Sequence, residues 1–440
     1  TVISPKLFSH GMFMDGLWYA VLSRNLAEGI GSFWHLKFTE TIYKSFYEHP
    51  PLAFGLESIL FSIFGDSFLV ERFYSLITLL ATIFILLHFW KKLSKSSETI
   101  YIVLLFFITI PLVKWCTENN LLENTMSIFT LTSVYFQYKS LSEKNFLNTF
   151  IAAFCILLAF LTKGFTGLFV FSFFFWCAIF DIKNWRNYAS KTLYLIGFFF
   201  ILIGLMFQFV PDSYEFLSIY FNKQVVGSVT SISTVDSRFY ILQRCLTEEL
   251  LIPIILLIIT LVLNRNKLTN FTKSKEFKLG LILLLVGFSG VIPIMISMKQ
   301  RGFYIMATFP FFALGFGLIA SPLLKNFTFE KININILRGV SILSVIVMLF
   351  VGIKSSKETR RTKELVNDCT LISNQFEKGA TIGACPKLSS EYSLMGYMMR
   401  YNHISLDFEN ENDCYISKSN CIEELKKKSL KVVPLKTLQY

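Results

Sequence analysis

Residues 67–90 read SFLVERFYSLITLLATIFILLHFW, and the basic run KKLSK follows at 91–95. A helix needs roughly 20 mostly apolar residues to cross the hydrocarbon core of a bilayer, and this stretch has that length. The chain contains about ten segments of this kind, which predicts an all-α polytopic membrane protein, a helical bundle. We expect the spans at 67–90, 99–115, 121–138, 147–162, 164–180, 191–210, 249–263, 278–297, 303–320 and 335–353.

The composition agrees with a membrane protein and excludes an ordinary soluble enzyme. Of the 440 residues 53% are hydrophobic and only 16% are charged, whereas soluble domains carry about 25% charged residues. The net charge of +12 comes largely from Lys and Arg in short loops such as 91–98 and 264–277, as is typical of cytoplasmic loops. Nucleic-acid binding needs a contiguous basic face, so we expect membrane lipids as partners and no nucleic acid.

Two shorter apolar stretches are expected to lie in the outer interface of the membrane. Residues 52–64 are too few to span a bilayer as a helix. Residues 15–28 read as an amphipathic helix, with Trp18 at the headgroup level. The charge pattern places Asp15 outside, so we expect a first transmembrane helix before it in the full protein.

The composition changes after residue 354. We expect a membrane domain over 1–354 and a small α/β domain over 355–440 on the outer, periplasmic face, with strands at ATIGAC and KVVPL and a short helix at 420–429. This region holds four cysteines, for which disulfides and free thiols both remain open. They are Cys369, Cys385, Cys414 and Cys421.

The outer loops carry a small set of ionisable groups. Charge at membrane depth is costly, which makes such groups candidates for function. Pro50 and Pro51 fix the chain after Glu48 and His49, and so they aim both side chains. The candidates are Asp15, Glu48, His49, Arg72, Glu123, Lys163, Arg301 and Tyr304.

These groups form an acidic centre surrounded by cations. Asp15, Glu48 and Glu123 can deprotonate a nucleophile, and Asp15 with Glu48 could hold a divalent cation such as Mg²⁺ or Mn²⁺. Arg and Lys can hold a phosphate. The combination suits transfer of a group away from a phosphate leaving group at a membrane surface.

Structural explanations exist for the same residues. Asp15 could cap a helix, Glu48 could be a solvated loop residue, and Glu123 could pair with Lys163 or Arg301 between helices. Lys299 reads as an anchor at the headgroups. A transporter or lipid flippase, or an assembly subunit, would also be polytopic. The lack of an internal repeat, and acids near one face, favour an enzyme.

The order of the motifs resembles a known family. The motifs are EHPPL at 48–52, FGDSFLVERFYSL at 64–76, LLEN at 121–124, LTKGF at 161–165 and RGFYIMATFP at 301–310. Over roughly residues 10–320 the chain resembles the bacterial type C membrane glycosyltransferases related to protein O-mannosyltransferases and to the lipid A aminoarabinose transferase.

The resemblance implies a polyprenyl-phosphate sugar donor and an inverting transfer on the periplasmic side of the inner membrane. The acceptor would be a lipid, a glycan or a protein. Asp15 and Glu123 match the family's two acidic positions, and Glu48 matches its turn before the short helix. The resemblance places His49, Lys163, Arg301 and Tyr304 near the donor phosphate. The chain departs from the family at Gly16, often Glu, at His49, often Lys, and at Glu123, usually Asp.

Overall fold

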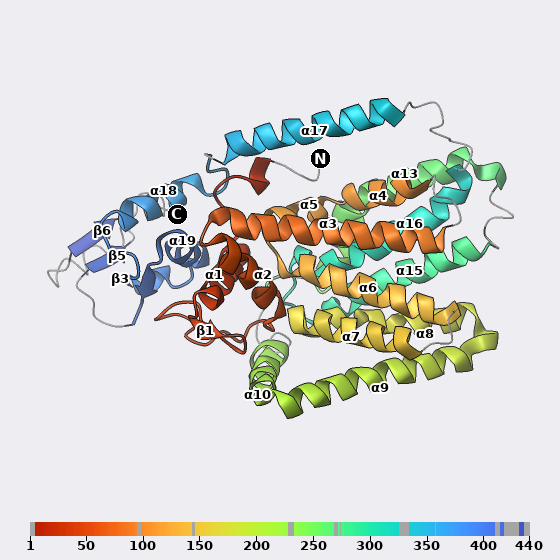
Figure 1. The fold of residues 1–440 in the computed structure, drawn as a ribbon, viewed down its shortest axis with the longest axis horizontal. Helices are drawn as coiled ribbons and strands as arrows, with labels where there is room; N and C mark the ends of the chain where they lie inside the picture. The colour runs from red at the N-terminus through yellow and green to blue at the C-terminus, as the bar shows by residue number, and fades with distance from the viewer. Residues whose placement is uncertain are drawn as a thin grey trace.

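The computed structural model shows a helical bundle with a small sheet domain at one end (Figure 1). Two short helices, α1 (Met14–Ala27) and α2 (Leu52–Phe64), lie between the bundle and the sheet domain. The structure describes residues 5–94, 99–142, 146–227, 233–267, 272, 274–324, 334–356, 358–409, 414–417 and 431–434.

Each segment expected to span the membrane is helical. By length and apolarity, five helical stretches of the described chain could cross a bilayer, or up to seven if each of two bent pairs is one span. This confirms a multi-pass membrane protein, although fewer helices meet the criteria than the ten segments expected from hydropathy. The α-helices found in the ten expected segments, whether or not they meet these criteria, are α3 (Phe68–Leu93), α4 (Ile100–Ile108), α5 (Pro111–Glu118), α6 (Leu122–Ser142), α7 (Phe146–Lys163), α8 (Ser172–Phe180), α9 (Trp185–Phe209), α13 (Leu251–Leu263), α15 (Lys275–Val291), α16 (Phe309–Leu324) and α17 (Ile334–Ser355).

Helix α6 does not meet those criteria because it carries a polar row inside the bundle. Glu123, Ser127, Thr130, Ser133, Gln137 and Ser140 recur every three or four residues and are all buried. That spacing places them on one helix face. Ser133 donates to the carbonyl of Ala152, and the Gln137 amide donates to that of Val170. The row therefore ties α6 to its neighbours, where no water competes for the hydrogen bonds.

The chain reverses direction at Gly164, between α7 and the 3₁₀ helix η3 (Gly164–Phe171). Gly164 has φ +70°, which favours glycine. A Cβ built on Gly167 would lie 3.0 Å from the Cβ of Ala159, which a continuous helix would keep about 12 Å away along its axis. The two expected segments 147–162 and 164–180 are thus the arms of a hairpin.

Helix α1 is buried, contrary to the expectation of a helix on the membrane surface. Trp18 is only 8% exposed and stacks on Phe38, with 3.9 Å between the ring centroids. Arg24 is 1% exposed and donates to the carbonyl of Met399 in α19 (Tyr392–Asn402). The amphipathic pattern of residues 15–28 predicted an exposed polar side, but α19, a distant segment of the chain, covers that side of α1.

The sheet domain has four parallel strands in the order β4-β3-β5-β6. Helix α18 (Lys363–Ser373) precedes it, and α19 connects β3 to β4. The expected strands ATIGAC and KVVPL correspond to β3 and β6, which confirms the α/β fold. The expected helix at 420–429 and Cys421 lie outside the described residues. Cys385 is disulfide-bonded, and Cys369 is free and buried. The strands are β3 (Thr381–Ala384), β4 (Ser405–Asp407), β5 (Cys414–Ser417) and β6 (Lys431–Pro434).

Candidate active site

A cavity of about 390 Å³ opens where α1, the loop before α2 and the start of the 3₁₀ helix η9 (Gly302–Thr308) meet. Tyr392, from the sheet domain, closes one side of this first cavity. The cavity brings together five of the residues expected at the site, from three separate parts of the chain. They are Asp15, Glu48, His49, Arg301 and Tyr304.

Asp15 lies in the first turn of α1, and its carboxyl faces the cavity. The N-cap of this helix is Phe13, so the explanation of Asp15 as the capping residue is wrong. Burial raises the pKa of the Asp15 carboxyl to about 6, helped by the charges of Glu123 and Glu48 and opposed by those of Lys163 and Arg301. A carboxyl with this pKa is mostly ionised at neutral pH but is a stronger base than a free Asp.

Gly16 allows the chain to pack closely beneath Asp15. A Cβ at this position would lie 2.0 Å from the backbone oxygen of Asn119, so no side chain fits. The side chain of Asn119 in turn accepts a hydrogen bond from the backbone N–H of Phe13 at 2.8 Å. The missing carboxylate at Gly16 is therefore a consequence of how α1 docks on the segment before α6.

Glu48 and His49 precede α2, whose N-cap is Pro51. The phenol of Tyr43 donates a hydrogen bond of 2.7 Å to Glu48 Oε1, which orients the carboxylate at the cavity. Burial, with the charges of Lys163 and Lys299, lowers the pKa of His49 well below its usual value. His49 is thus a neutral imidazole at pH 7, able to form hydrogen bonds but not to act as a permanent cation for phosphate.

Glu123 and Lys163 do not line the first cavity but form a buried ion pair behind it. Their side chains are 0% and 4% exposed. The Lys163 ammonium also lies over the rings of Phe303 and Tyr304, 5.2 and 5.1 Å from their centroids. Of the alternatives for Glu123, the structure contains the pairing with Lys163. That pair supports the aromatic wall of the cavity from behind.

The segment before η9 adds a cation that the sequence interpretation missed. The backbone is extended at Ser297 and Arg301, and alternate residues of an extended chain point to the same side. Lys299 and Arg301 both line the cavity, while Gln300 points away, is 1% exposed and accepts from the backbone N–H of Ile241. The alternation of charged and uncharged residues in KQR, at 299–301, could have indicated that Lys299 faces the same side as Arg301. We had expected Lys299 to anchor at the lipid headgroups.

Arg72 lies outside the first cavity. Its guanidinium is buried and donates to the backbone carbonyls of Ser9, Gly11 and Glu118. Arg72 thus holds the segment before α1 against α3. It is a structural residue and not part of the cationic ring.

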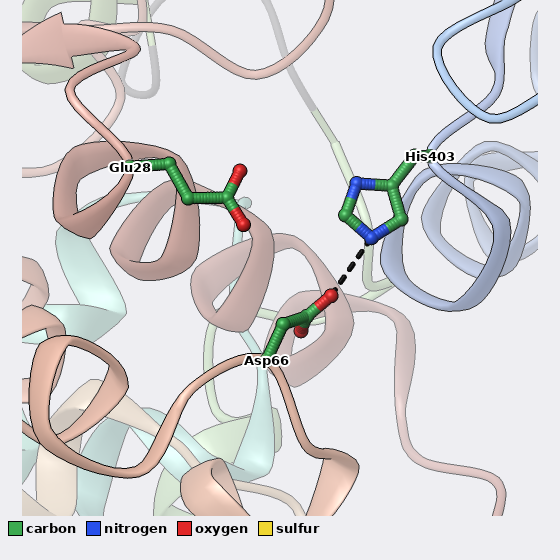
Figure 2. Close-up of side chains that lie close together, drawn as sticks. All are labelled: Glu28, Asp66 and His403. Atoms are coloured by element: carbon green, nitrogen blue, oxygen red, sulfur yellow. Dashed lines mark hydrogen bonds and ion pairs between the residues drawn. The ribbon is translucent and has the colours of Figure 1, made fainter.

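One other cluster has the composition of a metal site. Glu28, Asp66 and His403 bring potential ligand atoms within 4.8 Å of one another, and no other group of three in the described part of the chain does so (Figure 2). His403 Nε2 lies 2.7 Å from Asp66. Arg24 and Arg400 also contact Asp66, and their positive charges disfavour a cation. The cluster does not line the first cavity, and it joins the end of α1 and the turn before α3 to the end of α19.

Solved structures share the fold of this chain. The crystal structure of ArnT from Cupriavidus metallidurans bound to undecaprenyl phosphate matches with a TM-score of 0.63 at 13% identity, over 98% of this chain and 87% of that one. AglB from Archaeoglobus fulgidus, an archaeal oligosaccharyltransferase in complex with an inhibitory peptide and a dolichol-phosphate, matches with a TM-score of 0.51 at 14% identity, over 93% and 59%. The fold is that of the type C membrane glycosyltransferases.

The sequence itself carries a narrower match. The family model described as dolichyl-phosphate-mannose-protein mannosyltransferase matches residues 48–208, which include Glu48, His49, Glu123 and Lys163. A search of curated proteins finds no match. The family model and the solved structures together confirm the resemblance to the type C membrane glycosyltransferases that the motifs indicated.

Proposed function

We propose that this chain is a membrane glycosyltransferase that moves a sugar from a polyprenyl-phosphate donor to a lipid, glycan or protein acceptor on the periplasmic side of the inner membrane. The observation that carries the proposal is the first cavity, where Asp15, with a pKa of about 6, shares one space with Lys299 and Arg301. A base and a pair of cations are the groups that such a transfer needs.

The roles follow from the position of each group. Lys299 and Arg301 stabilise the donor phosphate as negative charge builds on its leaving oxygen. The bond from the sugar to that oxygen breaks, a bond to the acceptor oxygen forms, and Asp15 takes the acceptor's proton. Polyprenyl phosphate leaves. Glu48, oriented by Tyr43, and the neutral ring of His49 position the substrates through hydrogen bonds.

A divalent cation fits one part of this arrangement. Asp15 and Glu48 both line the first cavity, and the charge of Glu48 helps to raise the pKa of Asp15. Carboxylate oxygens are the ligands that Mg²⁺ and Mn²⁺ prefer. When bound, such an ion would neutralise charge on the donor phosphate. Lys299 and Arg301 supply positive charge to the same cavity without it.

The alternative of a transporter or lipid flippase receives less support. Transporters bind substrate near the bilayer midplane, between helices that are interrupted there. Here Asp15, Glu48 and Arg301 gather at the end of the bundle beside the sheet domain, as the contribution of Tyr392 to the first cavity indicates.

The proposal is tested by binding of undecaprenyl phosphate to the purified chain in detergent, measured by native mass spectrometry. We expect one lipid per chain, with affinity at least tenfold weaker in Arg301→Gln and in Lys299→Gln. The exposed Lys223→Gln serves as the matched control. Absence of binding, or equal binding by all variants, would contradict the assignment of the phosphate site.

A further inference from the structure

A second cavity, of about 670 Å³, adjoins the first. The two share Phe13, Thr234, Arg301 and Phe303 in their linings. The rest of its wall comes from helix α5, the loop at 234–236, helix α12 (Tyr240–Arg244), the π-helical turn η6 (Cys245–Glu249) and the segment at 300–302. Ligands held in the two cavities would therefore meet at Arg301, whose charge also acts on Asp15.

Aromatic rings form one side of the second cavity. Trp115 stacks on Phe303, with ring centroids 5.8 Å apart and planes at 22°, and lies 5.2 Å from the ring of Phe13. Trp115 is half-buried, and Tyr240 faces the same space. The packing of Trp115 on Phe303 fixes an aromatic wall on which the C–H faces of a ligand can lie.

Carboxylates dominate the polar lining of the second cavity. Glu249 is buried and accepts a hydrogen bond of 2.9 Å from the backbone N–H of Leu112. Asp236 and Glu248 are exposed at the cavity. Ionised carboxylates only accept hydrogen bonds, so this lining suits a ligand rich in hydroxyl donors.

Two arginines line the second cavity: Arg301, at the rim shared with the first cavity, and Arg244, whose charge is already neutralised. Arg244 Nε lies 3.5 Å from Glu248 and 3.5 Å from Glu249, and its guanidinium donates to the phenol oxygen of Tyr240 at 2.8 Å. Gly302 makes room for it, because a Cβ there would lie 2.3 Å from Arg244 Nε. Phosphate recognition needs free Arg or Lys, so the second cavity differs in chemistry from the first.

We infer that the second cavity binds the acceptor, and that the acceptor presents a carbohydrate hydroxyl and not a phosphorylated headgroup. The inference rests on the proposed function, which requires a second substrate beside the donor. Aromatic faces and carboxylates together fit the two surfaces of a sugar.

The geometry also places the reacting hydroxyl. A sugar held against Trp115, with hydroxyls donating to Asp236 and Glu248, can extend past Phe13 into the first cavity. There its free hydroxyl reaches Asp15, the group that takes the proton in the proposed transfer.

The test uses saturation-transfer NMR on the purified full chain with undecaprenyl phosphate bound. The probes are the methyl glycosides of glucose, galactose, mannose and N-acetylglucosamine, and a short serine- and threonine-containing peptide. The variant combines Asp236→Asn with Glu248→Gln, which keep the shape of both side chains. The control is Glu215→Gln, an exposed carboxylate on α10 (Pro211–Tyr220) outside both cavities.

We expect saturation transfer to at least one glycoside, reduced at least fivefold in the double variant and unchanged in the control, with lipid binding retained in all three. Lipid binding without any glycoside signal, a signal unaffected by the double variant, or a signal from the peptide alone would overturn the inference and leave the proposed function intact. Failure of the parent chain to bind the lipid would instead count against the proposed function.

Discussion

Replacing Asp15 by Asn should abolish transfer and at the same time stabilise the folded protein. The pKa of the Asp15 carboxyl is raised from 3.8 to about 6, chiefly by burial. Keeping the group ionised in the folded state therefore costs about 3 kcal/mol at pH 7.5, taking 1.36 kcal/mol for each pH unit. Asn has the same shape and no charge, so Asp15→Asn removes this cost.

The stability advantage of Asp15→Asn should grow as the pH rises. A raised folded pKa means that the folded state binds more protons than the unfolded state between pH 3.8 and about 6, so stability falls as pH rises through that window. Below it, the carboxyl is neutral in both states. The advantage of Asp15→Asn should thus be about 3 kcal/mol at pH 7.5 and about 1 kcal/mol at pH 4.5.

The assay is thermal unfolding in detergent with a chelator present, so that no cation bound between Asp15 and Glu48 offsets the effect. The exposed Asp212→Asn is the matched control and should stay within about 0.5 kcal/mol of the parent. Transfer by Asp15→Asn should fall by about 10² to 10⁴, the usual contribution of a general base. A lower melting temperature for Asp15→Asn at pH 7.5, or a stability advantage that does not shrink at pH 4.5, would show that burial of the Asp15 charge does not destabilise the fold.

Three further substitutions test the supporting structure. Glu123→Gln leaves the Lys163 ammonium buried without its partner and should cost about 3–5 kcal/mol of stability in thermal unfolding, most of it recovered when Lys163→Met is added; an unchanged melting temperature would show that the pair is not structural. Tyr43→Phe removes the hydrogen bond to Glu48 and should lower kcat about fivefold, for a loss of about 1 kcal/mol, with little change in melting temperature; unaltered kinetics would exclude Tyr43 as a positioning residue. Gly164→Ala forces an unfavourable φ at the hairpin and should destabilise by about 1 kcal/mol or more, measured as reduced folded yield and melting temperature. Gly197→Ala on α9, where a Cβ would meet no atom within 4 Å, should not.

The sequence predicts the architecture well because the bilayer constrains it. Long apolar segments must be helices, since no other local structure satisfies their backbone in lipid, and every expected segment is helical. The burial of α1 could not be predicted in the same way. It depends on α19, nearly 400 residues later, which supplies the carbonyl partner of Arg24, and such long-range contacts leave no local pattern.

The candidate active site could likewise be predicted from the sequence only in part. Charge in an apolar chain singled out Asp15, Glu48 and Arg301, and the fold brings all three to one cavity. Charge alone could not separate a residue that faces the cavity from one behind it, so Lys163 was expected at the phosphate but pairs with Glu123. The second cavity escaped notice because Trp115, Asp236 and Glu248 are ordinary residues until the fold assembles them.

We propose that Asp15 is the base of a sugar transfer at the periplasmic face. This proposal is tested most directly by mass spectrometry of envelope lipids, glycans and glycoproteins from source cells that carry either the parent or Asp15→Asn at equal membrane abundance. We expect that Asp15→Asn removes one sugar-sized mass from a defined acceptor while the lipid-phosphate-linked sugar accumulates. The same profile from the parent, from Asp15→Asn and from a deletion strain would contradict it.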